Sequence, residues 1–281
     1  MRTAVVGHTE WIEFGHVDRV PTAGEIAHAR FGWEEAGGGG AVSSVQLARL
    51  AGTCTFFTAL GDDDRALRTE RDLSGLGVRM RAALRPEPCR RAVTLVDEAG
   101  ERTIITLGRR LEPAGADHLP WEELEDTDAV YLTAGDVEAV RAARRAKVLV
   151  TTSRAMTRLG EAGVALDAIV GSSRDASERF DPDVLSKTPA LVVRTNGSKG
   201  GSFETADGHS GRYDPVQPPG PVIDTYGAGD SFAAGLTFAL GAGMRVEDAL
   251  ALAARCGAWC VSGRGPYGRQ LTVDELSSIE T

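Results

Sequence analysis

The sequence predicts an α/β fold in which helices cover both faces of a parallel β-sheet. Short apolar runs with the character of strands alternate with helical segments from about residue 55 onward, and this alternation is typical of strand–helix–strand crossovers. The chain has 281 residues, of which 42% are apolar and 25% charged, as in an ordinary globular protein. Glycine-, threonine- and valine-rich pieces near the N-terminus and around residue 95 do not fit the alternation. They predict a small separate β element.

The predicted elements begin with a strand over 3–6 and two extended stretches over 11–17 and 25–31, separated by a turn. The glycine run Gly37–Gly40 opens a helix that continues through Leu50, because apolar residues recur along it at helical spacing. The further elements are expected as a helix over 65–76 and as strands over 55–60, 79–84, 92–97, 103–107, 129–133, 148–152, 168–170 and 191–194.

Charge and cysteine content narrow the class of protein. A net charge of −9 with no basic stripe argues against a nucleic-acid or membrane-surface partner, and the arginine-rich stretch 141–147 fits a solvated helix face. No apolar run approaches the roughly 18 residues that span a bilayer. The four cysteines have no metal-type spacing. Cys256 and Cys260 are four residues apart in an Ala-rich helical pattern, so we interpret these two as buried apolar residues, and we expect a reducing cytoplasm.

The segment 222–236 carries the clearest chemical signal. It follows an extended, proline-containing piece and becomes a helix, because Phe232 and Leu236 begin an apolar series at helical spacing. Small residues therefore lie at or just before a helix N-terminus, where free backbone N–H groups and the helix dipole favour a phosphate. The residues of this anion cradle are Gly227, Ala228 and Gly229.

Asp230 follows the cradle in the first turn of the helix. It can simply complement the helix dipole, as acids in first turns often do. Phosphoryl transfer, however, needs donors on the developing negative charge and a base within reach of the attacking hydroxyl. One loop here supplies both, which favours Asp230 as a catalytic base.

The residues from Asp224 to Asp230, with Tyr226 in the variable place, resemble the C-terminal signature Asp-Thr-x-Gly-Ala-Gly-Asp of the ribokinase-like, PfkB-type carbohydrate kinase family. The resemblance implies a doubly wound, mostly parallel sheet flanked by helices, with a small β lid over the substrate. It implies one kinase domain over 1–281, with the lid built from about 10–33 and 79–108.

The same resemblance implies roles for these residues. Asp230 takes the proton from the acceptor hydroxyl while the amides of 227–229 form an anion hole for the phosphoryl group of ATP. Asp224 and Tyr226 lie where many relatives bind a monovalent cation such as K⁺. The family's Asn-x-x-Glu motif aligns with residues 172–175, where Asp175 keeps a carboxylate that can orient a Mg²⁺-bound water.

Two further regions carry the resemblance. The glycine run is similar to the diglycine motif that approaches the substrate, through Gly38 and Gly39. The stretch 193–201 is similar to a strand and turn that contact the nucleotide. Its matching positions are Thr195, Gly197, Ser198 and Gly200.

The departures from the family pattern leave the acceptor open. Val42 and Ile12 occupy places where relatives commonly carry an Asn and an Asp that bind sugar hydroxyls, and neither side chain can accept a hydrogen bond. Glu10 or Glu13 can take over the acceptor role. Trp11 either stacks on a substrate ring or only packs the lid, and Arg91 either meets an acidic substrate or is an exposed structural arginine.

We therefore expect ATP-dependent phosphorylation of a hydroxyl on a small molecule: a sugar, a sugar acid or a nucleoside. The alternative is a ligand-binding or regulatory protein that kept the fold and lost turnover, which the apolar replacements would suit. A weaker third hypothesis is a kinase for a non-sugar alcohol such as a pyrimidine precursor, against which the lid counts. In the family that the chain resembles, exposed lid strands often pair between two subunits, so the resemblance implies a homodimer.

Overall fold

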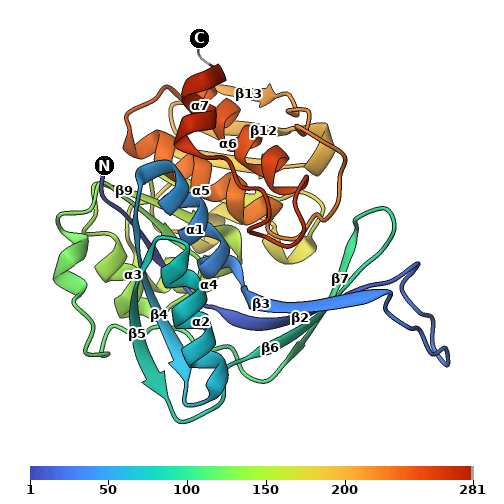
Figure 1. Ribbon diagram of the computed structural model, residues 1–281. Coiled ribbons are helices and arrows are strands. Elements are labelled where there is room, and N and C mark those ends of the chain that lie inside the picture. The colour runs from blue at the N-terminus through green and yellow to red at the C-terminus, as the bar shows by residue number, and fades with distance from the viewer. Residues whose placement is uncertain (280–281) are drawn as a thin grey trace.

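The computed structural model describes residues 1–279, which form a large sheet flanked by helices and a smaller second sheet (Figure 1). The large sheet has the strand order β13-β12-β11-β10-β9-β8-β1-β4-β5. All neighbouring pairs from β11 to β5 are parallel, and only β12 and β13 run antiparallel at one edge. The mostly parallel, helix-flanked sheet expected from the sequence is confirmed. Its strands are β1 (Thr3–Val6), β4 (Cys54–Gly61), β5 (Val78–Arg85), β8 (Ala129–Leu132), β9 (Val148–Thr152), β10 (Ala168–Ser172), β11 (Leu191–Thr195), β12 (Gly201–Thr205) and β13 (Ser210–Tyr213).

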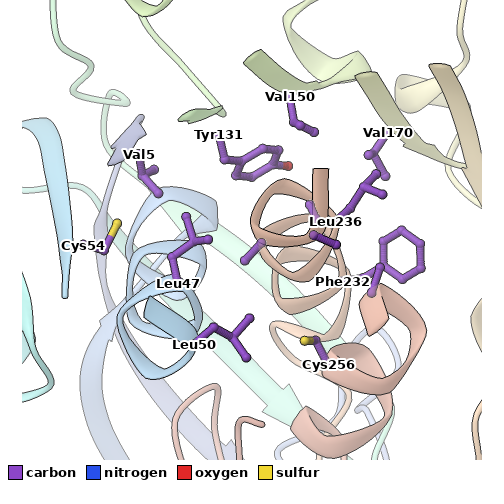
Figure 2. Close-up of a cluster of buried hydrophobic side chains, with 14 of the residues drawn as sticks. Val5, Leu47, Leu50, Cys54, Tyr131, Val150, Val170, Phe232, Leu236 and Cys256 are labelled. Carbon is purple, nitrogen blue, oxygen red and sulfur yellow. The ribbon is translucent and has the colours of Figure 1, made fainter. Parts of the chain in front are cut away.

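Helices cover both faces of this sheet because its central strands are apolar on both sides. Val5 and Tyr131 pack against α1, α5 and α6, whereas their neighbours Val6 and Leu132 pack against the layer of α3 and α4. Figure 2 shows the first of these layers, with side chains of α1 and α5 under the strands. The helices are α1 (Gly39–Ala51), α2 (Asp64–Gly75), α3 (Val137–Ala143), α4 (Met156–Ala162), α5 (Ala228–Gly241), α6 (Val246–Cys260) and α7 (Val273–Ile279), with 3₁₀ turns η1 (Trp121–Leu124), η2 (Ser153–Ala155), η3 (Ala176–Glu178), η4 (Pro182–Val184) and η5 (Gly197–Lys199).

The small sheet extends away from the large one and forms the lid (Figure 1). Its strand order is β3-β2-β6-β7. The strands expected over 92–97 and 103–107 form the antiparallel pair β6–β7. The bounds are β2 (Glu10–His16), β3 (Phe31–Gly37), β6 (Arg91–Val96) and β7 (Arg102–Leu107).

Two expectations about the lid were wrong in detail. Residues 25–30 are not a strand; β3 begins only at Phe31 and runs into the glycine run. The stretch 79–84, assigned to the lid from the sequence, lies in β5, which pairs in parallel with β4 at the edge of the large sheet. The reason is that Val78 packs into the main core and Met80 packs against it, which a lid strand could not do.

The glycine run brings α1 against the end of β1. A Cβ on Gly40 would lie 2.6 Å from the carbonyl oxygen of His8 and 2.7 Å from the Phe56 ring. Only a residue without a side chain permits this approach. Gly38, at the N-cap of α1, has φ of 85°, a left-handed conformation that also favours glycine. The N-terminus of α1 is thereby held at the carboxyl end of β1. No helix within residues 1–279 has the length and apolar character needed to cross a bilayer.

Candidate active site

The residues expected to form an anion cradle lie at the N-terminus of α5. Gly227 caps the helix with φ of 81°, which turns the chain sharply into α5. Gly229 is exposed, and a Cβ built on it would meet no atom within 4 Å. The first amides of a helix have no partner inside it. The amide of Ala228 donates to the carbonyl of Thr225 at 3.5 Å, whereas the space beside Gly229 is open to an anion.

Asp230 lies directly against the diglycine. Its Oδ1 is 2.9 Å from the position that a Cβ on Gly39 would take, and the hydroxyl of Ser43 donates to its backbone carbonyl at 3.1 Å. The first turns of α1 and α5 therefore meet at this carboxylate. Burial, and next the charge of Glu178, raise the pKa of Asp230 to about 6, against the opposing charges of Arg102 and Arg154. A carboxyl with such a pKa is suited to accept a proton near neutral pH.

Glu178, which the sequence did not single out, is the carboxylate with the largest influence on Asp230 after burial. It ends η3, accepts the backbone N–H of Ser172 at 2.7 Å and forms an ion pair with Arg154 at 2.7 Å. Asp175 instead pairs with Arg154 at 2.6 Å and accepts the N–H of Ser177 at 2.9 Å. In the sequence, Glu178 could be noticed only as a second acidic residue three positions after Asp175. The folded structure is needed to show that the charge of Glu178 raises the pKa of Asp230.

Buried polar atoms without partners gather beside the diglycine. A Cβ on Gly38 would lie 3.3 Å from both Glu10 and His8, so these side chains flank it. Among residues 1–279, four such atoms belong to this neighbourhood: Nδ1 of His8, Oε2 of Glu10, Nε of Arg90 and Oγ1 of Thr133. Two of these atoms, Oε2 of Glu10 and Nε of Arg90, lie 3.5 Å apart as an ion pair without a hydrogen bond. Buried polar groups are normally paired, so a polar ligand would be favoured here.

The opposite side of this site is apolar. Ile12, Val42 and Tyr226 are buried in one cluster with Phe14 of the lid. The hydroxyl of Tyr226 accepts the backbone N–H of Gly38 at 2.9 Å. The amide of Gly38 therefore already has a hydrogen-bond partner within the protein. Ile12 and Val42, which stand where relatives carry polar side chains, are buried by apolar packing.

Trp11, Glu13 and Arg91 lie on the other face of the lid sheet. Successive side chains of a strand point to opposite faces, so Trp11 and Glu13 point away from the side of Glu10 and Ile12. Trp11 is 1% exposed, lies under the guanidinium of Arg68 at 4.1 Å and donates to a carboxylate of β3. Glu13 and Arg91 form an ion pair with each other at 2.7 Å. The structure does not bring these three residues to the diglycine, and we leave them out of the site that we propose.

The residues expected to contact the nucleotide form the turn between β11 and β12. Thr195 ends β11, Gly197 and Ser198 lie in η5, and Gly200 has φ of 73°. A Cβ on Gly200 would lie 2.1 Å from the carbonyl oxygen of Tyr213, so the turn requires glycine. The turn follows the carboxyl end of a parallel strand, the edge at which α/β sheets bind ligands.

Asp224, expected to hold a monovalent cation, is buried and accepts the backbone N–H groups of Tyr226 at 2.8 Å and Gly265 at 3.0 Å. Burial raises its pKa. Among residues 1–279 it forms no ion pair with an arginine or lysine, although the charge of Arg102 acts on it. The Tyr226 side chain does not contribute, because its hydroxyl is turned to Gly38. No group of three potential metal ligands from His, Cys, Asp and Glu occurs in the described part of the chain.

Known proteins share the sequence pattern and the fold of this chain. The family described as pfkB family carbohydrate kinase matches residues 2–179 and 166–272. An ATP-dependent ribose-1-phosphate kinase from Halopiger xanaduensis is 29% identical over 295 residues, covering 99% of this chain and 98% of that protein. The ribokinase of Thermotoga maritima shares the fold with a TM-score of 0.77 and 19% identity, covering 100% and 99% of the two chains. Arabidopsis thaliana ribokinase, complexed with ribose and ATP, has a TM-score of 0.76 and 20% identity, covering 99% and 98%. The chain therefore belongs to the pfkB family of carbohydrate kinases and is a phosphotransferase that acts on a small molecule.

Proposed function

We propose that the protein transfers the γ-phosphoryl group of ATP to a hydroxyl of a sugar, sugar acid or nucleoside, with Asp230 as the general base. The observation that carries this proposal is the place of Asp230. Its carboxylate stands between the open N-terminus of α5 and the diglycine, beside the unpaired polar atoms of His8, Glu10 and Thr133. A hydroxyl bound at those atoms would have the base on one side and the phosphoryl cradle next to it. The kinases and ribokinases among the relatives support an acceptor of this class.

In this proposal the amides of residues 227–229 stabilise the charge on the moving phosphoryl group, and Gly38, Gly39 and Glu10 contact the acceptor. ATP lies along the carboxyl edge of the large sheet against Thr195, Gly197, Ser198 and Gly200. Mg²⁺ on the nucleotide would neutralise phosphate charge. Asp175 and Glu178, which share Arg154 as an ion-pair partner, are the carboxylates that would hold it here. K⁺ would be held by Asp224 and backbone atoms.

The second candidate function is ligand binding or regulation without turnover. The observation in its favour is the apolar cluster of Ile12, Val42 and Tyr226, with the Tyr226 hydroxyl on the Gly38 amide. ATP consumption across a panel of sugars, sugar acids, sugar phosphates and nucleosides separates the two functions. Saturable binding of a panel member with no ADP formed from any of them would favour the second candidate.

The pH dependence of turnover should reflect Asp230. Because the pKa of this carboxyl is raised to about 6, the base is protonated and inactive below that pH and ionised above it. We expect kcat to fall about tenfold per pH unit below about pH 6 and to be level above it. Glu178→Gln removes a neighbouring negative charge, which lowers the pKa of Asp230, so the acid limb should move to lower pH. If the acid limb of the kcat profile came from ionisation of ATP, it would lie at the same pH in wild type and in Glu178→Gln. An unchanged limb in this variant would therefore contradict the assignment of Asp230 as the base.

The cradle can be tested with Gly229→Ala. The new methyl group meets no atom within 4 Å, and alanine favours a helix by up to about 1 kcal/mol, so the melting temperature should stay equal or rise. The methyl occupies the space in which the phosphoryl group would lie, and kcat/KM should fall about tenfold or more. Gly75→Ala at the end of α2, where the added methyl also meets nothing, is the matched control. Equal activity of the two variants would place the phosphoryl group elsewhere.

We also propose a homodimer through the lid and a place in the cytoplasm. The edge strand β7 is exposed along its whole length and presents Ile104, Ile105 and Leu107 to solvent, and such an edge readily pairs with another strand. The four cysteines are free and buried, which suits a reducing compartment. Light scattering should give twice the monomer mass, and Ile105→Lys should return the monomer.

A further inference from the structure

A buried glutamine connects the two helices that meet at Asp230. Gln270 lies in the segment between α6 and α7 and is 1% exposed. Its side-chain nitrogen Nε2 donates to the backbone carbonyl of Val42 in α1 at 3.1 Å and to the hydroxyl of Ser231 in α5 at 3.2 Å. A carbonyl can only accept a hydrogen bond, so the nitrogen of the amide must face Val42. One side chain thus holds both helices.

These two hydrogen bonds lie beside the proposed base. Ser231 directly follows Asp230 in α5. Val42 directly precedes Ser43, whose hydroxyl donates to the backbone carbonyl of Asp230 at 3.1 Å. The bonds from Gln270 and from Ser43 therefore close a ring through the beginnings of α1 and α5. This ring holds the two helix starts against each other, and with them the carboxylate and the diglycine.

The ring is built where packing alone would favour an apolar side chain. Ser43 and Ser231 are fully buried, and Oε1 of Gln270 has no hydrogen-bond partner within residues 1–279. A buried amide that is only partly hydrogen-bonded costs free energy, so stability alone does not account for Gln270. An amide provides what an apolar side chain lacks, which is directional contact with both helices at once.

The segment that carries Gln270 is anchored without the help of this side chain. Arg49 of α1 donates to the backbone carbonyls of Tyr267 at 2.8 Å and of Gln270 at 3.3 Å. Nε2 of Gln46, also on α1, donates to the carbonyl of Leu271 at 2.8 Å. Gln46 is fully buried as well, but this bond connects α1 to the segment and not to α5. The two glutamines therefore have separate tasks: Gln46 holds the segment, and the Gln270 amide holds the two helices.

We propose that Gln270 is a positioning residue for phosphoryl transfer, which holds Asp230 against the diglycine so that the carboxylate meets the acceptor hydroxyl in the direction that the reaction needs. It touches no substrate and acts through Val42 and Ser231. The inference rests on the kinase function proposed above and adds to the same site a residue outside the signature segment. Because a misplacement of about 1 Å costs roughly two orders of magnitude in rate, loss of the amide should act on kcat and not on binding.

The test replaces the amide with a thioether of similar length. Gln270→Met removes both hydrogen bonds and suits a buried position, so the protein should fold. We expect kcat to fall about tenfold or more, with KM for ATP and for the acceptor within about twofold of wild type. Gln46→Met is the matched control, because it removes one buried hydrogen bond of the same kind that does not involve α5. This control should keep the wild-type kcat.

Ser231→Ala deletes a single hydroxyl and tests the same contact if Gln270→Met folds poorly. It should lower kcat with both KM values unchanged. Added to Gln270→Met, it should lower kcat little further, because both changes break the same hydrogen bond. Fully additive losses would mean that Ser231 acts independently of Gln270 and would count against the ring.

A measurement without turnover separates this inference from the proposed function. The carboxyl group of Asp230 can be titrated by carbon NMR with isotope-labelled aspartate, its signal being the one that is absent in Asp230→Asn. A carboxylate released from the ring is more hydrated, so Gln270→Met should lower the pKa of Asp230 from about 6 toward the ordinary value of an aspartate. Gln46→Met should leave this pKa unchanged.

If wild type phosphorylates an acceptor, kcat decides. A wild-type kcat in Gln270→Met, an equal loss in Gln46→Met, or a loss that comes from KM alone overturns the inference. If wild type phosphorylates nothing in the panel, the titration decides. A shift confined to Gln270→Met then means that the kinase proposal fails while Gln270 still positions the carboxylate, and no shift, or the same shift in both variants, overturns the inference as well.

Discussion

Asp230→Asn should lower kcat by roughly 10²- to 10⁴-fold, the usual contribution of a general base, while KM for ATP and for the acceptor changes little. Asparagine has nearly the same shape but cannot take the proton from the acceptor hydroxyl. Folding should not suffer. The raised pKa of Asp230 means that the folded protein binds this proton more tightly than the unfolded chain, so above about pH 6 the buried carboxylate costs stability. Its replacement should leave the melting temperature at pH 8 equal or higher.

Rapid-quench measurement of the first turnover, with melting followed in parallel, checks this expectation. Asp183→Asn, an exposed aspartate on η4, is the control for loss of a carboxylate and should retain full activity. A near wild-type rate in Asp230→Asn would remove the residue from the chemistry and leave it as a complement to the dipole of α5.

Gly39→Ala should reduce kcat about 10²-fold with little loss of stability. The added Cβ would lie 2.9 Å from Oδ1 of Asp230, the free end of a side chain that can swing aside, and its next contact is at 3.6 Å. The fold can therefore accept the methyl group, but the base must leave its position, and displacements of this order at a reacting group cost about two orders of magnitude in rate.

Gly40→Ala provides the contrast. Its Cβ would meet the backbone oxygen of His8 at 2.6 Å and the buried Phe56 ring at 2.7 Å, neither of which can move easily. It should lose about 1–3 kcal/mol of stability, measured as a shift of the denaturant midpoint. If Gly39→Ala proved as destabilising as Gly40→Ala while keeping its rate, the contact with Asp230 would have no catalytic meaning.

The sequence predicted those parts of the fold and site that are local along the chain. Gly227 and Asp230 could be placed at a helix start because the apolar spacing after them is helical, and α5 begins at Ala228 as expected. Glu178 and Arg90 could not be found in this way, since they reach the site from η3 and from the segment that precedes the lid strand β6. No spacing along the chain connects them with Asp230.

Strand parity explains the rest. The alternation of β2 shows that Glu10 and Trp11 face opposite ways, but which of them faces the active site depends on how the lid docks on the large sheet. Ile12 and Phe14 settle this by packing with Tyr226 and Val42. The stretch 79–84 was assigned to the lid but lies in the large sheet for a similar reason. A short apolar strand can pair in either sheet, and only the packing of Val78 in the main core shows that this one belongs to the large sheet.

The junction between β3 and α1 links the lid mechanically to the acceptor site. The lid strand ends at Gly37 and the helix begins at Gly39, so one residue, Gly38, separates them. At this crossing, one of several between the two sheets, rotation of the lid would act on Gly38, whose amide donates to the Tyr226 hydroxyl. A lid that swings on this joint would break or remake that hydrogen bond and move Gly39 relative to Asp230. Closure of the lid over the acceptor would then be coupled to the alignment of Asp230, and the hydrogen bond from Gly38 to Tyr226 would hold the closed position.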